Sequence, residues 1–288
     1  MKRVSGAGSR WGGRWVLLLA TVLLAGCSLV SLAYNRLPTL AYWRLDGMLD
    51  LDGPQSALVR QELDRWHGWH RREHLPRYAQ ALQRWQALAL QDVTPAQVCE
   101  AAQQVRLWAQ EAGQQVLPLA MRLAPTLTEA QLQHWQRHQA ERDDEFRADF
   151  MAADGTVNPK RLQKAVERAE MFYGTLSAEQ RAWWRERLQR SAFDPQRALA
   201  LRQRRFDDFT ATVRRIQQGG GAQAEVQAAW DRVWQAATPA EAAADARVFN
   251  DGCAQLAELH NRTTPQQRQR AQQRLQAFAQ DFLVLSAQ

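Results

Sequence analysis

Five dipeptides that join a polar residue to a proline constrain the fold of this chain most strongly. They are Thr94-Pro95, Asn158-Pro159, Asp194-Pro195, Thr238-Pro239 and Thr264-Pro265. In each, the first side chain can accept a hydrogen bond at a helix N-cap, and proline suits the first helical position. Each dipeptide therefore predicts the start of a helix.

The segments between these starts keep the period of a helix. Apolar residues recur at steps of three, four or seven in two clear stripes: Leu199, Phe206, Phe209, Val213 and Ile216, and Leu275, Phe278, Phe282 and Leu285. No stretch alternates with the period of two that indicates a strand. We therefore predict an all-α fold, a multi-helix bundle of about eight to ten helices. Gly219 to Gly221 should end the helix that begins at Pro195 and act as a hinge.

The N-terminus predicts export from the cytoplasm. Residues 1–14 carry four basic and no acidic side chains, and a largely apolar run of eleven residues, 15–25, follows. This combination is typical of a secretory signal, and the run is shorter than the ~20 residues of a membrane span. The next residues, Leu24-Ala25-Gly26-Cys27, resemble the bacterial lipobox. The alternatives are an ordinary signal peptide with an unrelated cysteine, and an anchor that is retained.

The lipobox resemblance implies cleavage between Gly26 and Cys27, and attachment of diacylglyceryl and acyl (palmitate) chains to Cys27. Ser28, which replaces the aspartate of an inner-membrane sorting signal, implies the outer membrane. We thus expect a signal peptide at 1–26, an irregular lipid-anchored tether at 27–53 and a helical periplasmic domain at 54–288 of a Gram-negative lipoprotein.

The charge balance argues against nucleic acid as a partner. Cleavage at Cys27 would leave 33 basic against 30 acidic side chains, so the net charge of +7 belongs partly to the precursor. The basic run at 202–205 is followed by Asp207 and Asp208 and is typical of a solvated helix face.

Two cysteines remain once Cys27 is modified. In an oxidising compartment, Cys99 and Cys253 most simply form one disulfide, and a pair of buried free thiols is the alternative. The chain lacks the C-x-x-C sequence of many thiol redox enzymes.

Four helix starts share a Thr/Ser-x-x-Gln sequence: Thr94 to Gln97, Thr128 to Gln131, Ser177 to Gln180 and Thr264 to Gln267. These resemble the L-T-x-x-Q motif of small periplasmic chaperones. The same spacing builds a capping box, in which hydroxyl and glutamine bond reciprocally across the first helical turn. The motif is therefore compatible with a chaperone and with an ordinary helical protein.

A second resemblance covers nearly all of the chain after the lipobox. Its motifs follow one another in the order Tyr34-Asn35-x-Leu37-Pro38, Trp69-His70-Arg71, Leu75-Pro76-x-Tyr78, Tyr173-Gly174 and Leu259-His260-Asn261. Together they resemble a family of proteobacterial lipoproteins classified as a domain of unknown function. That resemblance implies a mostly helical envelope protein and supplies no catalytic residues.

Histidines on two helices form the sharpest chemical pattern. His67, His70 and His74 share a helical face, and His134, His138 and Glu141 have similar spacing. Either set suits Zn²⁺ or Cu²⁺, so both are candidate metal ligands. Alternatively, Trp66 and His70 form a core-facing pair, with His67 and His74 exposed or capping. In the same alternative, His134 and His138 flank the helix stripe of Leu132, Trp135 and Phe146.

No motif for catalysis stands out. The sequence contains no G-x-S-x-G, no H-E-x-x-H and no phosphate-binding P-loop. We therefore expect a non-enzymatic protein without a cofactor, which binds or assembles an envelope protein partner by receiving a helix in a groove. A chaperone-like holdase is the first alternative, and a metal-binding protein or enzyme is the second.

Overall fold

The computed structural model describes residues 29–152 and 156–288, and within these ranges every regular element is a helix. The helices are α2 (Leu29–Asn35), α3 (Leu37–Leu49), α4 (Gly53–Glu73), α5 (Leu75–Leu88), α6 (Pro95–Gln114), α7 (Leu117–Leu123), η1 (Ala124–Thr126), α8 (Glu129–Phe150), α9 (Pro159–Tyr173), α10 (Ala178–Gln189), α11 (Pro195–Gln217), α12 (Ala222–Trp234), α13 (Pro239–Asn261) and α14 (Pro265–Ser286). The all-α prediction is confirmed. The predicted signal peptide and Cys27 lie outside the described residues.

The five predicted helix starts are also confirmed. The side chains of Thr94, Asn158, Asp194, Thr238 and Thr264 each accept a hydrogen bond from a backbone N–H in the first turn of the helix that follows. A further N-cap, Asp52, starts α4. These starts depend only on neighbouring residues, which explains why the sequence reveals them.

Leu-Pro dipeptides make the helices more numerous than the eight to ten expected. Pro38, Pro76 and Pro118 each occupy the second position of a helix, in α3, α5 and α7. Proline cannot donate a hydrogen bond to the preceding turn, and it disfavours helical geometry at the residue before it. Each dipeptide therefore divides one helical stretch into two.

The expected irregular tether at 27–53 is wrong for the residues that the structure describes. Residues 29–49 form α2 and α3, and Tyr42 and Leu49 of α3 are buried in the core. The Tyr42 hydroxyl lies 3.1 Å from Ser56 Oγ on α4. Pro38 and Gly53 begin helices here, so neither residue marks a loop.

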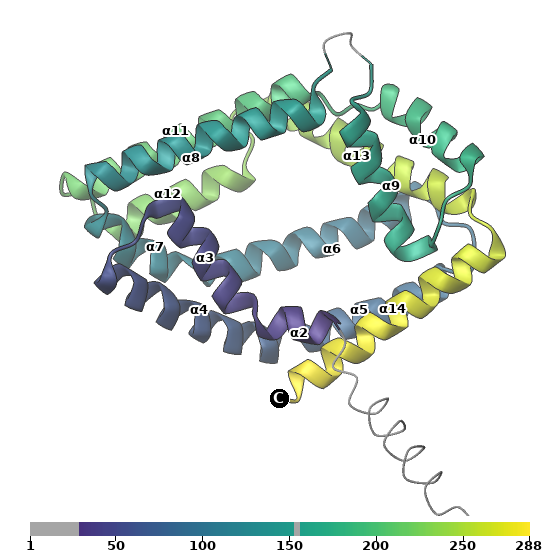
Figure 1. Cartoon of the computed structure of the whole chain (residues 1–288), viewed down its shortest axis with the longest axis horizontal. Helices are drawn as coiled ribbons and strands as arrows, with labels where there is room; N and C mark the ends of the chain where they lie inside the picture. The colour runs from purple at the N-terminus through teal and green to yellow at the C-terminus, as the bar shows by residue number, and fades with distance from the viewer. Residues whose placement is uncertain (1–28, 153–155) are drawn as a thin grey trace, which may run out of the picture.

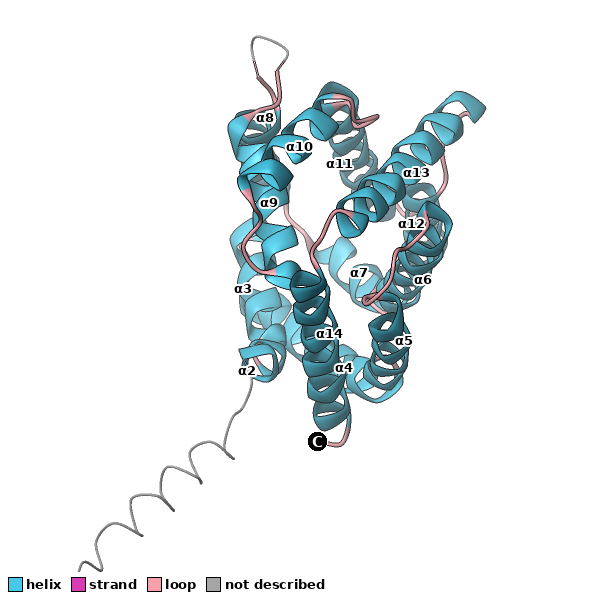
Figure 2. Ribbon diagram, turned by 90° about the vertical axis from the view of Figure 1, so that its right-hand side faces the viewer, coloured by secondary structure: helices cyan, strands magenta, loops and turns pink. Residues whose placement is uncertain are grey.

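The helices form a flattened ring that α6 crosses (Figure 1). One end holds a hydrophobic core built by α3, α4, α7, α8, α11 and α12, and the other holds a core built mainly by α9, α10, α13 and α14. The C-terminal helix α14 packs along α5, so residues far apart in sequence close the ring. Figure 2 views this closing edge and shows two helical layers, one with α8, α9 and α3 and the other with α13, α12 and α6.

Two connections fix the central helices. A disulfide joins Cys99 of α6 to Cys253 of α13, as the cysteine count predicts. After α11, Gly219 has a φ of 98°, and the Gly220 N–H donates to the Arg215 carbonyl. Glycine adopts this left-handed geometry without strain, so the triglycine ends α11 as expected and α12 packs back against it. Its role as a hinge stays a prediction.

No helix in the two described ranges combines the length and the apolar character that crossing a membrane requires.

Candidate functional site

A largely apolar cavity of about 740 Å³ lies among α5, α6, α9, α10 and α13. Its wall includes Trp85, Leu88, Phe172, Trp184, Leu188 and Leu259. This volume lies within the ~300–1,000 Å³ range of small-molecule sites in proteins. The cavity is therefore the strongest candidate site for binding a ligand.

Small residues on facing helices create this space. Ala101 and Ala102 of α6 line the cavity, and so does Gly252 of α13. A Cβ atom added to Gly252 would meet no atom within 4 Å. The Cys99–Cys253 disulfide lies beside these residues and ties the two walls together.

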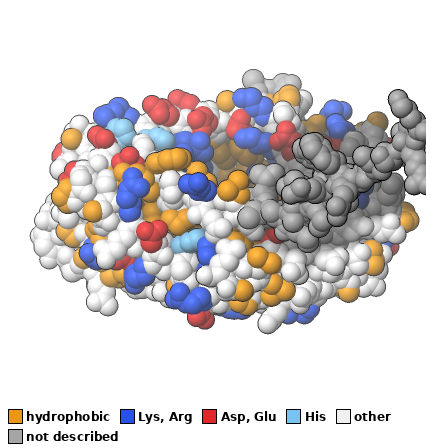
Figure 3. All heavy atoms as spheres, turned by 60° about the horizontal axis from the view of Figure 1, so that its bottom comes forward, with side chains coloured by type: hydrophobic (Ala, Val, Ile, Leu, Met, Phe, Trp, Pro, Cys, Tyr) orange, Lys and Arg blue, Asp and Glu red, His pale blue; other side chains and the backbone are white. Residues whose placement is uncertain are grey.

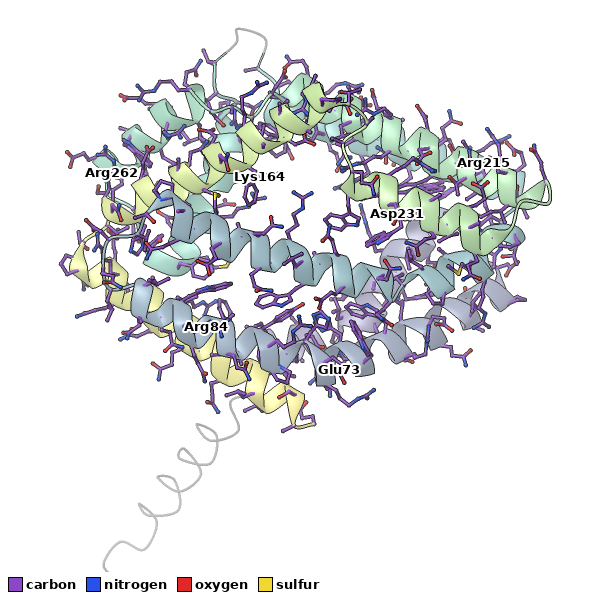
Figure 4. All side chains as sticks on the ribbon, turned by 180° about the vertical axis from the view of Figure 1, so that it is seen from behind. Glu73, Arg84, Lys164, Arg215, Asp231 and Arg262 are labelled. Atoms are coloured by element: carbon purple, nitrogen blue, oxygen red, sulfur yellow. A yellow bond between two sulfur atoms is a disulfide. The ribbon has the colours of Figure 1, made fainter. Side chains whose placement is uncertain are left out.

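Basic side chains from a single helix face line part of the cavity. Arg161, Lys164 and Arg168 of α9 follow one another at spacings of three and four. Lys164 forms an ion pair with Asp149, and Arg168 is exposed. In Figure 4, Lys164 lies at the end of the molecule that holds the cavity, while Arg215 and Asp231 mark the opposite end.

Arg161 differs from its neighbours because its guanidinium is half-buried without an acidic partner. Its Cζ atom lies 4.9 Å from the centre of the Phe193 ring. Among the described residues, no carboxylate lies within ion-pair distance of it, and burial lowers its pKa from the ordinary value. Its N–H donors form no hydrogen bond with the described residues, and the Asp251 carboxylate attracts it only at longer range, so the donors stay available at the cavity wall.

A tyrosine–histidine pair supports the cavity at the end of α9. The Tyr173 hydroxyl lies 2.9 Å from Nδ1 of His260, and Nε2 of His260 lies 2.9 Å from the Gln91 carbonyl oxygen. A carbonyl can only accept, so Nε2 carries the proton and Nδ1 accepts from Tyr173. Burial lowers the pKa of His260 and raises that of Tyr173 to about 12. The pair is therefore neutral and structural.

A larger cluster of the same kind joins α2, α4 and α5. Nδ1 of His70 lies 2.9 Å from the Tyr34 hydroxyl, and Nε2 of His70 lies 3.2 Å from the Tyr78 hydroxyl. The Tyr78 hydroxyl is also 3.0 Å from Nδ1 of His74. The His70 and His74 rings stack with their centres 5.1 Å apart. We call these four residues the Tyr–His cluster.

Burial keeps the Tyr–His cluster uncharged. It lowers the pKa of His70 to about 4, with the neighbouring His74 and His67 contributing in the same direction. It also lowers the pKa of His74 and raises those of Tyr34 and Tyr78 to about 12. At neutral pH the cluster is therefore a chain of hydrogen bonds between neutral rings.

The glutamines of four capping boxes pair across helix ends. Gln131 donates to the side chain of Gln55 at 2.6 Å and Gln55 donates to Gln131 at 3.2 Å, while Gln180 and Gln267 exchange bonds of 2.8 and 3.0 Å. Each pair also caps backbone carbonyls of neighbouring segments. The fifth box, at Thr94 and Gln97, places its glutamine at the cavity wall.

Comparison with known proteins adds a family to this geometry. Residues 47–236 match the model of a family of unknown function, DUF6279. The chain belongs to this family. No curated protein and no protein of solved structure matches it. The matched region of this DUF6279 chain runs from within α3 to just beyond α12, so α13, with half of the disulfide, lies outside it.

The structure brings the motif residues of this DUF6279 chain together in two places. Tyr34 bonds to His70, and Asn35 accepts from Arg71 at 2.5 Å. Trp69 packs on His74, Leu75 is buried beneath the junction, and Pro76 starts α5. The first motifs in the chain thus fasten α2 to the bend between α4 and α5.

The later motifs, Tyr173-Gly174 and Leu259-His260-Asn261, make contacts at the C-terminal ends of α9 and α13. Asn261 exchanges two hydrogen bonds with the backbone of Val93, at 2.9 and 3.0 Å. Gly174 ends α9 with a φ of 71°, and a Cβ there would lie 2.4 Å from the Arg270 guanidinium. The motif residues of both places therefore hold helices together, and Tyr173, Leu259 and His260 among them also line the cavity.

Neither histidine set forms the predicted metal site. Among the described residues, no three His, Cys, Asp or Glu side chains are arranged to hold a metal ion. Tyrosine hydroxyls occupy the ring nitrogens of His70 and one of His74, and His67 is buried beside the Tyr34 ring. The alternative of a core-facing Trp66–His70 pair is confirmed by their stacked rings, but His67 and His74 are buried as well.

In the second set, His134, His138 and Glu141, the side chains do not meet at one point. Nε2 of His134 lies 3.0 Å from the Gly47 carbonyl oxygen, and His138 lies 4.0 Å from Glu141.

In the first set, the order His70-x-x-Glu73-His74 matches the H-x-x-E-H sequence of some zinc enzymes. Because Tyr34 and Tyr78 engage these histidines, that sequence serves the helix junction instead.

Proposed function

We propose that this DUF6279 protein is a non-enzymatic lipoprotein, anchored to the outer membrane through Cys27 and facing the periplasm, which binds an apolar group of an envelope partner in its cavity. The observation that carries the proposal is the half-enclosed, apolar cavity itself. Anchoring at a membrane would raise the effective concentration of any partner held at the same surface.

The size of the cavity argues for an apolar group and against a whole helix. A helix about 10–12 Å across fills roughly 500 Å³ per turn. A cavity of about 740 Å³ would therefore hold less than two turns. The helix-in-groove mode that the sequence predicts suits this space less well than a single chain or ring does.

Exposed apolar side chains that follow Cys27 in the sequence support the location of the anchor. Leu32, Leu40 and Trp43 are 55%, 48% and 61% exposed on α2 and α3, shortly after Cys27 in the sequence. Figure 3 brings forward the edge that is lowest in Figure 1, and apolar side chains are interspersed with basic ones there. Tryptophan and arginine side chains suit the boundary between lipid and water.

The chemistry of the Tyr–His cluster supports a role without catalysis. A general base works best with a pKa near the operating pH. The pKa of His70 is about 4 and those of its tyrosine partners are about 12, so neither type of group exchanges protons readily at neutral pH.

Site-specific photocrosslinking in cells tests the proposal. A photoreactive amino acid replaces Val105, which is 50% exposed at the cavity, in the full-length lipoprotein. The control position is Leu107 on the same helix, which is 42% exposed and does not line the cavity. We expect adducts from position 105 and none from 107.

A second pair of variants asks whether such adducts need the cavity. Gly252→Phe should fill open space and abolish crosslinking at 105, whereas Gly252→Ala adds one methyl group and should preserve it. Equal adducts from 105 and 107, or adducts that survive Gly252→Phe in folded protein, would refute binding in the cavity.

The holdase alternative has one feature in its favour. Val105 and Leu256 are 50% and 45% exposed where they line the cavity, and such residues can engage unfolded chains. A holdase predicts that the protein suppresses aggregation of unrelated clients at near-equimolar ratio and that Gly252→Phe weakens this effect. Absence of suppression would remove this alternative.

A further inference from the structure

On the α9 wall of the apolar cavity, Arg161 is a cationic side chain without an ion pair. Arg161 stacks on Phe193 and forms no ion pair within 4 Å with a described residue, since Asp251 acts on it only at longer range, and Trp85, Phe172 and Leu188 line the same cavity. A guanidinium offers a rigid fork of donors that matches a carboxylate through two parallel hydrogen bonds. The site is therefore complementary to a molecule that is apolar along its length and anionic at one end.

We infer that the cavity binds a long-chain fatty acid, with its carboxylate on Arg161 and its acyl chain along the cavity wall that α6 and α13 form together. The inference rests on the proposed function, because it takes the envelope partner whose apolar group enters the cavity to be a lipid, a free fatty acid whose acyl chain is that group.

The charges around Arg161 favour an anion over a neutral head. Arg168 and Lys164 lie on the same face of α9, and although Lys164 pairs with Asp149, Lys160 lies 3.5 Å from that same carboxylate. The nearest competing acid, Asp251, is already bonded to Arg187, to Gln255 and to the backbone N–H of Ala192. Arg161 is thus left available to a ligand.

The burial of Arg161 favours a small head. Its guanidinium lies against the Phe193 ring, and Ser191, which also lines the cavity, is hydrogen-bonded to Asp251. A carboxylate is the smallest anionic group that engages both arms of the fork. A lysophospholipid would have to fit a glycerophosphate into the same place.

Photolabelling of the full-length protein in envelope membranes tests this inference. The probe is palmitate with a diazirine near the end of its chain, and mass spectrometry locates the labelled residues. We expect labels on α6 near Ala101 and on α13 near Leu256, and their loss in Gly252→Phe. Unlabelled palmitate should compete at a lower concentration than hexadecanol or lysophosphatidylglycerol.

Charge variants test the head group. Arg161→Gln should raise the palmitate concentration needed for half-maximal labelling roughly 10- to 100-fold. The concentration of diazirine-hexadecanol needed should not change. Arg161→Lys should fall between the two proteins. The matched control is Arg60→Gln, since Arg60 also stacks on an aromatic ring, that of Tyr42, and lies outside the cavity.

The outcomes separate this inference from the proposed function. If hexadecanol labels the cavity as well as palmitate does and Arg161→Gln changes neither, the cavity binds apolar groups but the fatty-acid inference is wrong. Preference for lysophosphatidylglycerol would also overturn it. If no probe labels the cavity, the inference is wrong. The proposed function is then tested separately by the crosslinking from position 105.

Discussion

At the scale of single residues, burial determines what histidine and tyrosine do in this protein. His74 is fully buried and His70 nearly so, each bonded to the Tyr78 hydroxyl. A charged imidazolium would lose its hydration there, so the fold stabilises the neutral form. The same side chains that suggest a metal site in the sequence thus become hydrogen-bonded packing elements.

The first prediction concerns pH. The pKa of His70 falls from 6.5 to about 4 on folding, so between these values the unfolded chain binds a proton that the folded protein does not. The contribution of neutral His70 to the free energy of unfolding is therefore fully present above about pH 6.5. This contribution, roughly 3 kcal/mol, is lost as the pH falls from 6.5 through 4. Urea unfolding of the full chain from pH 8 to 4 measures this loss.

The variant His70→Gln identifies the residue responsible. Glutamine retains hydrogen-bonding groups but does not titrate, so its unfolding free energy should fall less steeply with decreasing pH than that of the unaltered protein. His67, His74 and His260 act in the same direction and leave a residual slope. Parallel pH profiles for the two proteins would contradict the role of His70.

At the scale of helices, local signals were readable from the sequence and long-range partners were not. Thr94 and Thr264 start helices because their own neighbours satisfy the cap. The pairing of Gln55 with Gln131 joins residues 76 apart in the sequence, and no local pattern indicates it. Likewise the sequence predicts that Pro38 belongs to a tether, because the packing of α3 against α4 is not visible in it.

The candidate site was hidden for the same reason. The cavity depends on small residues that face each other, such as Ala101 and Gly252, and the sequence does not say which helices meet. The disulfide is the one long-range contact that the sequence predicts, and it joins the α6 and α13 walls of the cavity. Arg161 carried no signal, because its lack of an acidic partner is a property of the fold.

The second prediction tests the paired capping boxes. Gln131→Ala removes one half of a box, both hydrogen bonds exchanged with the buried Gln55 amide and the bond to the Asp50 carbonyl, so it should lower the unfolding free energy by about 2–3 kcal/mol. Gln97→Ala breaks a box whose glutamine has no such partner and should cost about 1 kcal/mol. In a double-mutant cycle, Gln55→Ala and Gln131→Ala should be less than additive. Additive effects would show that the two boxes act independently.

The third prediction concerns the disulfide between α6 and α13. The two cysteines are 154 residues apart, and closing such a loop stabilises a fold by up to about 5 kcal/mol in the chain-entropy model. Protein with Cys99→Ser and Cys253→Ser should therefore unfold at lower urea concentration and label less with diazirine-palmitate. Chemical reduction of the unaltered protein should reproduce both effects, and unchanged unfolding in both cases would count against the disulfide as a clamp.

At the scale of the whole molecule, the described residues of the ring form two larger cores at opposite ends and a small third one between α5 and α14, and the cavity lies at one end. The core built by α3, α4, α7, α8, α11 and α12 lies apart from the cavity, which the opposite end contains. The Tyr–His cluster fastens α2 to α4 and α5, and α5 in turn supplies Trp85 to the cavity wall. The segment that follows the proposed anchor is thus tied to the element that borders the site.

This arrangement predicts how the anchored protein meets the bilayer. If Cys27 carries lipid, the exposed apolar side chains of Leu32, Leu40 and Trp43 follow the anchor closely enough in sequence to rest on the membrane surface. In vesicles whose acyl chains carry bromine, which quenches indole fluorescence on contact, Trp43 should be quenched. Trp43→Phe should therefore lower the quenched fraction of the total tryptophan emission. The control Trp230→Phe removes a partly buried ring in the distant core, so it lowers the unquenched emission alone and should not lower the quenched fraction. Equal quenching in the Trp43→Phe protein and the unaltered protein would mean that α3 stands clear of the bilayer and that the anchor alone holds the molecule.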